Sequence, residues 1–595
     1  MTRHNRFHRA IVETLAAAVV VFSLVVTTAN TASAQGSDPQ FRVKLDFNRW
    51  HDYAELKEDL LSLEQAYPKF LTYSSAGQSY GGRDIMVMTI NNPDTGHEES
   101  KAAMYIEANI HGNEIQGGEV CLYTVWYLME YYDRIDEVKR LVDERVFHVL
   151  PSVNPDGRDY FMHGTGSGAR TGHVPVDDDN DGAYDEDPAN DLNGNNVIEQ
   201  IRKYVPGEGT YRISRRDPRI MEPVPAGERG DWVLLGSEGI DDDGDGRVNE
   251  DGPGSYDGNR NWGSNWQPNY IQGGAMDYPF QLPESRAVAE FLMERPNISG
   301  VQSYHNSGGM ILRGPGAQWM GEYPSSDVAF YDKLGQQGAR MLPYYRYIVI
   351  WDSLYTVHGG SIDYTNDMLG IPSFSNELWN GGQYFNSPAL KQQQEDRNSP
   401  ISPDRANYFF DDHLEFGDQY IEWAEFEHPD YGTVELGGWK KLRGRIPPRF
   451  MNEELAHRNM AFSLYQADEM PLMQMGETSV ERLGDDVYRV RVELVNEKIA
   501  PTITALANRN HVVRPDLLTL EGNVEVVTAG IVANKFRPGP TQMIEQHDLK
   551  RIMFHSGHPG ETRRLIEYLV KGSGSINIRY ASVKGGTVET RLALR

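Results

Sequence analysis

His111 and Glu114 are the residues whose types and spacing could most directly do chemistry in this chain. They stand three positions apart in the run His111-Gly-Asn-Glu114, so one turn of backbone can aim both side chains at a single zinc ion. A distant histidine can complete a three-ligand zinc site that keeps one position open for water. His305 is the candidate for this third ligand. A histidine–glutamate pair arises easily by chance among 17 histidines. Whether this pair indicates a zinc site therefore depends on the elements around it.

The candidate ligands fall at the ends of segments that we expect to be strands of one sheet. Apolar, β-rich runs predict strands, and apolar residues at helical spacing predict helices between them. The expected strands are residues 85–90, 104–110, 146–153, 300–304, 346–351 and 372–378. The expected helices are residues 53–67, 115–132, 284–294, 327–341, 406–426 and 448–466. This alternation predicts an α/β fold with a mixed central sheet flanked by helices on both faces. His111 then lies just past a strand end, where open α/β sheets place their ligand crevice.

The order of the motifs resembles that of the zinc metallocarboxypeptidases of the carboxypeptidase A/B type, in an exported, bacterial-type form. The resemblance covers roughly residues 45–465. The matching segments, in chain order, are His111 to Glu114, Asn154 to Gly157, Asp257 to Trp262, His305, Tyr355 to Asp363 and Asn376 to Leu378. So many motifs in the same order are difficult to obtain by accident.

The resemblance implies that His111, Glu114 and His305 bind one zinc ion per chain. Glu377 would take a proton from the zinc-activated water and later pass it to the leaving amine, which is general acid–base work suited to a carboxylate beside a metal. Asp257 would orient the first zinc histidine from behind.

The resemblance also implies how a substrate is held. Asn259, Arg260 and Tyr355 would bind the free C-terminal carboxylate of a peptide, and the planar fork of arginine suits this task because it donates two parallel hydrogen bonds. Ile362 matches a position at the base of the side-chain pocket. An isoleucine there favours apolar or aromatic C-terminal residues, unless other insertions reshape the pocket.

One arginine of the family pattern is harder to locate. In the family, an arginine usually follows the turn that corresponds to Asn154 to Gly157. This arginine polarises the scissile carbonyl. Arg170 is the first choice, but a long insertion from about 162 to 256 blurs the register. Arg202 and Arg212 therefore stay open as alternatives.

The insertion contains two acidic segments that are nearly a repeat. Residues 177–187 and 241–251, here called the first and second acidic loops, are identical at 7 of 11 positions. Oxygen ligands at positions 1, 3 and 5 followed by glycine at position 6 suit calcium. The expected calcium ligands are Asp177, Asp179, Asp181, Asp241, Asp243 and Asp245. The glutamate that an EF-hand has at position 12 is missing, and the alternative is a pair of solvated acidic loops.

The remaining parts of the chain predict further domains and export. Residues 1–34 have a basic start, an apolar stretch and the small-residue run Ala32-Ser-Ala34, which is typical of a signal peptide. An uncleaved membrane anchor is the alternative. We expect the catalytic domain at 35–468 and a β-sandwich at 475–595, where 487–495, 524–532 and 576–583 alternate as strands.

These features favour an exported zinc carboxypeptidase, secreted or periplasmic, that acts on peptide or protein C-termini and has no stable membrane span after signal cleavage. The net charge of −29 argues against a nucleic-acid partner, because phosphates would repel such a surface. Two alternatives stay open. One is a related zinc amidohydrolase, such as a peptidoglycan peptidase or a deacylase. The other is a calcium-stabilised binding protein with an inactive peptidase domain.

Overall fold

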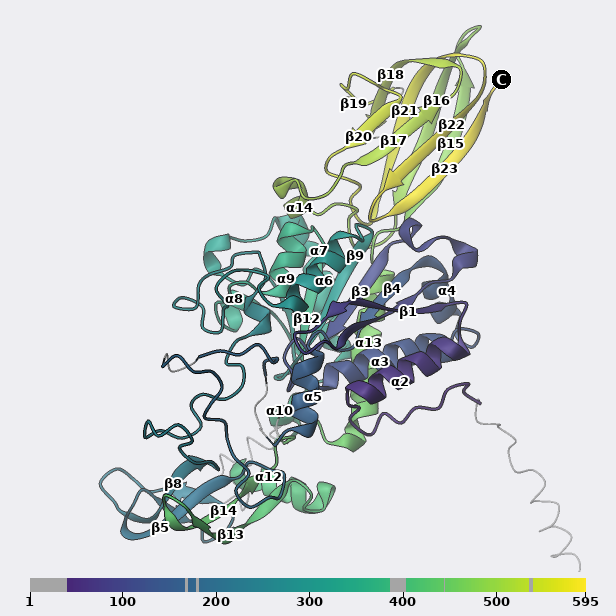
Figure 1. Ribbon diagram of the computed structural model, residues 1–595. Coiled ribbons are helices and arrows are strands. Elements are labelled where there is room, and N and C mark those ends of the chain that lie inside the picture. Colours follow the sequence, from purple (N-terminus) through teal and green to yellow (C-terminus); the bar gives the residue numbers. More distant parts are fainter. Residues whose placement is uncertain (1–39, 166–169, 178–180, 386–402, 444, 534–538) are drawn as a thin grey trace, which may run out of the picture. The chain divides into compact units, whose positions relative to one another are not determined.

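The computed structural model contains a mixed β-sheet (Figure 1). The candidate zinc ligands lie at or just beyond the ends of its strands. Within the described residues this sheet has eight strands, in the order β1-β2-β4-β3-β9-β12-β10-β11. The strands are β1 (Leu71–Gln78), β2 (Asp84–Ile90), β3 (Ala103–Ala108), β4 (Val146–Leu150), β9 (Ile298–Asn306), β10 (Met310–Arg313), β11 (Arg346–Val349) and β12 (Ser373–Leu378). The neighbouring strands β4, β3, β9 and β12 run parallel, so their carboxyl ends meet at one edge.

The structure describes residues 40–165, 170–177, 181–385, 403–443, 445–533 and 539–595. Residues Leu45–Arg595 form one unit, and the short segment 40–44 that precedes it has no helix or strand. The expected signal peptide at 1–34 lies outside the described residues. None of the helices that the structure describes is both long and apolar enough to cross a membrane.

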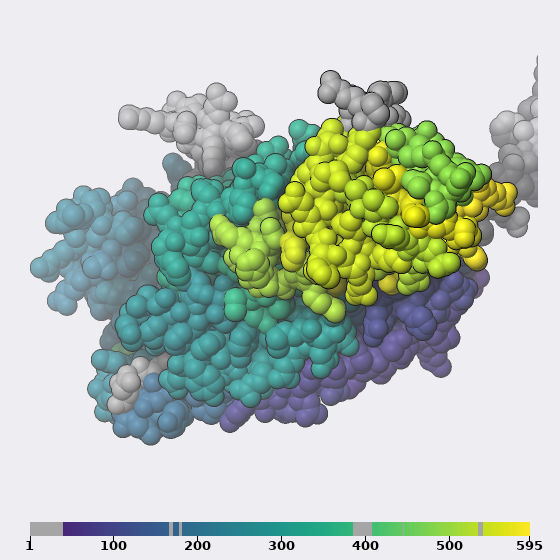
Figure 2. Space-filling view, turned by 90° about the horizontal axis from the view of Figure 1, so that it is seen from above, coloured from purple at the N-terminus to yellow at the C-terminus, as the bar shows by residue number. Residues whose placement is uncertain are grey.

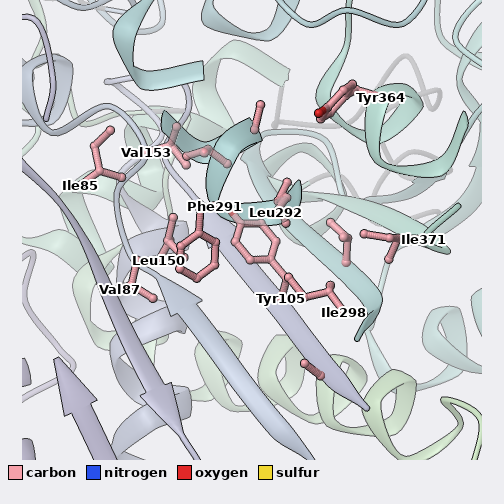
Figure 3. Close-up of a cluster of buried hydrophobic side chains, with 14 of the residues drawn as sticks. Ile85, Val87, Tyr105, Leu150, Val153, Phe291, Leu292, Ile298, Tyr364 and Ile371 are labelled. Carbon is pink, nitrogen blue, oxygen red and sulfur yellow. The ribbon is translucent and has the colours of Figure 1, made fainter. Parts of the chain in front are cut away.

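Helices pack on both faces of this sheet. They include α2 (Tyr53–Ala66), α3 (Gln116–Glu130), α6 (Pro283–Met293), α7 (Ser325–Met341) and α13 (Asn452–Asp468). On one face α3 lies so close that a Cβ on Gly117 would be 2.8 Å from the Cβ atoms of Ala108 and Tyr304. On the other face Tyr105 packs with Phe291 of α6 (Figure 3). Since side chains alternate along a strand, Tyr105 and Ala108 point to opposite faces, and the predicted α/β fold is confirmed.

One predicted helix, 406–426, is wrong over its second half. The structure has the helix α12 (Pro403–Phe410) and a π-helical turn, and then the strand β13 (Tyr420–His428). The glutamates and the alanine in this segment suit a helix, but the tyrosine, isoleucine, tryptophan and phenylalanine between them favour a half-buried strand.

The insertion is more regular than its sequence indicates. In the described part of the chain, β13 and β14 (Gly432–Trp439) pair with strands of the insertion in a six-stranded sheet, ordered β13-β14-β5-β8-β6-β7. The insertion strands are β5 (Gln200–Gly209), β6 (Tyr211–Ile213), β7 (Met221–Pro223) and β8 (Gly230–Ser237). The guanidinium of Arg202 lies between the rings of Trp232 and Trp423, at 4.7 and 4.3 Å. Because β14 comes more than 220 residues after β5, the pairing of these two strands cannot be recognised from local sequence.

The C-terminal strands form a β-sandwich, as expected. Among the described residues of this region, two sheets share one buried apolar core, and their strand orders are β15-β16-β21-β18-β19 and β20-β17-β22-β23. Their strands are β15 (Met473–Arg482), β16 (Val487–Asn496), β17 (Asp516–Glu521), β18 (Val524–Val532), β19 (Gln542–Met543), β20 (Arg551–Phe554), β21 (Thr562–Gly572), β22 (Gly574–Ser582) and β23 (Gly586–Leu594). Figure 2 shows their closely packed side chains in green to yellow.

Candidate functional site

His111, Glu114 and His305 converge at the carboxyl ends of β3 and β9. His111 and Glu114 stand in the short turn between β3 and α3, and His305 is the second-last residue of β9. The Nδ1 atom of His111 is 2.9 Å from Glu114 Oε2, and the Nδ1 atom of His305 is 3.0 Å from both. All three residues are buried. The parallel pairing of β3 with β9 brings these distant residues to the same place.

This triangle of atoms fits a zinc ion in both geometry and donor chemistry. Ligand atoms placed 2.0–2.1 Å from zinc in tetrahedral directions stand about 3.3 Å apart, close to the separations found here. A hydrogen-bonded arrangement explains the triangle less well, because at most one of the two facing Nδ1 atoms can donate to the other. Burial opposes the charged form of Glu114, but the two histidines hold its pKa well below the usual range. Two imidazoles and one carboxylate leave a fourth zinc position for water.

Asp257 and Arg170 contact the candidate ligands from outside the triangle. Asp257 Oδ1 is 2.8 Å from His111 Nε2, so this carboxylate accepts the ring proton and leaves Nδ1 as the metal-binding atom. Arg170 donates from Nη1 to Glu114 Oε1 at 2.8 Å and from Nη2 to Asp257 Oδ2 at 3.2 Å. The guanidinium therefore stands beside the candidate metal position.

Glu377 lies next to this group on β12. It pairs in register with His305 on β9, so both side chains are at the same height on the sheet. Burial raises the pKa of Glu377 to about 7, and the negative charge of Glu114 adds to the effect. A carboxyl group with a pKa near neutrality can both accept and return a proton.

A single pocket collects the residues expected to bind the substrate. It is lined by His111, Arg170, Asn259, Arg260, His305, Tyr355, Ile362 and Glu377, among others. Arg260 is buried, its Nη1 donates to the carbonyl oxygen of Asn259, and its Nε has no hydrogen-bond partner among the described residues. The ring of Tyr355 lies 6.0 Å from the Arg260 guanidinium and is half exposed. Asn259 Oδ1 accepts from Ser361 N, which leaves the amide nitrogen of Asn259 as a donor. These donors suit an anionic ligand.

The pocket has an apolar wall that sequence reasoning missed except for Ile362. Leu312 of β10 and Ile350 of the short helix α8 (Ile350–Ser353) pack in one cluster with Val357 and Ile362. All four line the pocket. Apolar residues in ordinary strands and loops carry no local signal of a pocket, so only the fold reveals them.

Arg445 is a second residue that sequence reasoning missed. It donates from Nη1 to Glu114 Oε1 at 3.1 Å and to the carbonyl oxygen of Asn306 at 2.9 Å. Glu114 Oε1 thus accepts from two guanidinium groups while Oε2 faces the histidines. The loop that carries Arg445 has no motif, and no sequence signal could have placed it here.

Of the three arginines considered for the scissile carbonyl, the described residues place only Arg170 in the pocket. Arg202 donates to Glu435 at 2.7 Å, and Arg212 to Glu222 at 3.2 Å, both within the six-stranded sheet. These two partners are unrelated to the zinc ligands.

The carboxylates of the acidic loops form groups that match the expected calcium ligands only in part. Oxygen atoms lie within 4.8 Å of one another in the trio Asp241, Asp243 and Asp245, as the spacing predicts for the second loop. In the first loop Asp179 lies outside the described residues, and Asp177 accepts from Gly182 N at 3.1 Å. Asp181 groups instead with Glu186 and with Asp243 of the other loop.

Comparisons with known proteins match most of the chain to two family models. A family model described as zinc carboxypeptidase matches residues 56–195 and 236–399, just over half of the chain. A second model, a domain of unknown function (DUF8731), matches 472–593.

Similar curated proteins include carboxypeptidase D of Drosophila melanogaster, 30% identical over 140 residues, which are 22% of this chain and 10% of that protein. Carboxypeptidase M of Mus musculus is 33% identical over 113 residues, 19% of this chain and 25% of that protein. The matches therefore span a quarter or less of these relatives. Among solved structures, thrombin activatable fibrinolysis inhibitor has 20% identity and a TM-score of 0.39, covering 57% of this chain and 70% of its own. Carboxypeptidase A from Helicoverpa armigera has 20% identity and a TM-score of 0.38, covering 62% and 77%.

Proposed function

Because the chain belongs to the zinc carboxypeptidase family, we propose that it removes C-terminal residues from peptides by zinc-dependent hydrolysis. One observation carries the proposal. The three candidate zinc ligands, the buried Glu377 carboxyl group and the Arg260 guanidinium, which has an unpaired Nε, border the same pocket or touch its lining. A carboxylate held by Arg260 would put the last peptide bond near the zinc site, so the cut would release a single residue.

His111, Glu114 and His305 would hold the zinc ion in this proposal. Bound there, zinc supplies Lewis acidity, which makes water a nucleophile at neutral pH and polarises a carbonyl group. Asp257 keeps the His111 ring oriented through the contact at Nε2. Arg445 and Arg170 donate to Glu114 Oε1 and so fix the carboxylate that faces the histidines.

Glu377 would transfer protons, and Arg170 would stabilise negative charge. The Glu377 carboxylate takes a proton from the attacking water as the new C–O bond forms. It then gives this proton to the amide nitrogen as the C–N bond breaks, which releases the amine. The guanidinium of Arg170 stabilises the negative charge that develops on the scissile carbonyl oxygen.

Substrate preference follows from the wall of the pocket. Ile362, Leu312, Ile350 and Val357 supply an apolar lining, which favours apolar or aromatic C-terminal side chains. Asp363 also lines the pocket, but burial and the neighbouring Asp367 raise its pKa to about 8. This carboxyl group is therefore largely neutral at pH 7 and offers little attraction to a basic side chain.

The proposed test is digestion of a peptide library with random C-terminal residues by the zinc-loaded protein, read by mass spectrometry. We expect loss of one residue at a time from the C-terminus, with phenylalanine and leucine released at least tenfold faster than arginine at pH 7. Ile362→Asp should reverse this order, because a charged group at the pocket base pairs with a basic side chain. Cleavage inside the peptides would favour an endopeptidase. An intact library, with hydrolysis of acylated amino acids or cell-wall peptides in a parallel assay, would favour an amidohydrolase.

We also propose that the protein is exported, with residues 35–468 as the catalytic domain and 475–595 as a separate sandwich. The basic, apolar and small-residue sequence of 1–34 supports export. N-terminal sequencing of the protein from the extracytoplasmic fraction of its host should begin at Gln35. An intact Met1 on membrane-bound protein would instead support an uncleaved anchor.

A further inference from the structure

The two acidic loops pack against each other at their ends. Asp187 and Asp251, the last residues of the two loops, form an isolated antiparallel bridge in which Asp187 N donates to the carbonyl oxygen of Asp251 at 3.1 Å. The Asp187 carboxylate reaches into the second loop and accepts from the backbone of Asp242 and Asn249, at 3.2 and 2.9 Å. The loops therefore form one structure with carboxylates on both sides of the bridge.

Several carboxylate oxygens at this junction are shielded from solvent and have no hydrogen-bond donor in the part of the chain that the structure describes. Both oxygens of Glu186, Glu250 and Asp251 are shielded from solvent and have no partner among the described residues. Asp251 is fully buried. Glu186 faces Asp251, and Glu250 faces Asp187, each as carboxyl against carboxyl. A carboxylate shielded from water without a partner is costly, and two that face each other repel as well, so a bound cation would stabilise the junction.

Oxygen atoms from both loops are close enough to share ions. Asp181 and Glu186 of the first loop come within 4.8 Å of Asp243 of the second loop. Asp187 also groups within 4.8 Å with Asp243 and Glu250. Asp243 belongs to both groups, so the two candidate positions are adjacent.

We infer that described carboxylates of both acidic loops form one composite calcium site, with Asp243 shared between adjacent ions. They are Asp181, Glu186 and Asp187 of the first loop and Asp243, Glu250 and Asp251 of the second. Calcium suits this set because it takes six to eight oxygen ligands in flexible geometry, whereas magnesium demands a near-ideal octahedron and keeps several waters. The site thus joins the loops to each other and does not consist of two independent loops.

The composite site is connected to the segments that contact the candidate zinc ligands. Asp185 of the first loop accepts from Gly254 N at 3.4 Å, and Thr171 donates to the carbonyl oxygen of Pro253 at 3.3 Å. Arg170 directly precedes Thr171, and it donates to Glu114. Asp257 follows Gly254 within the same short segment, and it contacts His111. Calcium would therefore brace the contacts behind the zinc centre. This last step rests on the proposed function, but calcium binding itself does not.

The test is calcium binding by the full-length, zinc-loaded protein, measured by calorimetry and by terbium luminescence sensitised through Tyr184 in the first loop. The double variant Glu186→Gln/Glu250→Gln should bind calcium at least tenfold more weakly than the wild type. The control Glu208→Gln/Glu228→Gln removes the same charge from two exposed positions of the insertion and should bind within twofold of the wild type. Equal binding by both double variants, or no binding by the wild type at millimolar calcium, would overturn the inference.

Thermal unfolding keeps the test valid if the variant folds poorly. Calcium should raise the Tm of the wild type and of the control but not of Glu186→Gln/Glu250→Gln, because a ligand stabilises only the state that binds it. Without calcium, the variant should melt no lower than the wild type, since one charge of each repelling carboxylate pair is gone. A calcium-dependent rise in Tm that is equal in all three proteins would contradict the assignment. Peptide hydrolysis is measured separately, so an inactive protein that binds calcium would contradict only the proposed function.

Discussion

Peptide hydrolysis by the Glu377→Gln variant is expected to be about 10³-fold slower than by the wild type, with about one zinc ion still bound per chain. Glutamine has nearly the same shape as glutamate but cannot take a proton from water. The three ligand atoms belong to His111, Glu114 and His305, so the metal site is not altered. The measurements are kcat with an apolar-terminated peptide and zinc content by elemental analysis of the same sample.

A matched control separates loss of the proton acceptor from loss of negative charge. Glu290→Gln makes the same chemical change at an exposed position of α6, and its kcat should stay within twofold of the wild type. Residual activity above about a tenth of the wild-type value in Glu377→Gln would remove Glu377 from its proposed role. Loss of zinc from this variant would show instead that the carboxylate supports metal binding.

The part of the site that could be predicted from the sequence consists of residues in short motifs. His111 and Glu114 are three positions apart in the sequence, and His305 directly follows a predicted strand. An α/β sheet with both strand ends at one edge therefore predicted that the three residues meet. Glu377 follows the same logic, because β12 pairs with β9. Each of these residues stands at or beyond the end of a strand, where function accumulates in sheets of this kind.

The rest of the site depends on contacts that local sequence does not encode. Arg445 reaches Glu114 from a loop 331 positions away, and nothing in that loop distinguishes it from a surface arginine. In the sequence, the apolar wall residues Leu312 and Ile350 cannot be distinguished from ordinary core residues. The sheet of the insertion was not predicted for the same reason. Its strand β5 is only half buried, and the strand β14 that pairs with it lies far along the chain. Periodicity predicts elements but not which distant elements meet.

Replacing the C-terminal carboxylate of a peptide by an amide should lower kcat/KM of the wild type by roughly 30- to 5,000-fold. This range corresponds to about 2–5 kcal/mol for breaking one side of a buried, hydrogen-bonded charge pair. The partner is Arg260, whose buried Nε has no hydrogen-bond partner in the described part of the structure. Arg260→Ala should cause a loss of similar size with the carboxylate substrate.

The decisive comparison combines the two changes. If Arg260 binds the carboxylate, the Arg260→Ala variant should barely distinguish the acid from the amide, since the group that reads the charge is gone and the two losses do not add. Arg346→Ala, an exposed arginine on β11 outside the pocket, should keep the full discrimination of the wild type. Fully additive losses in Arg260→Ala would mean that the carboxylate is read elsewhere. Equal cleavage of acid and amide by the wild type would mean that no carboxylate is read, and the pocket would then serve an amidase or an endopeptidase.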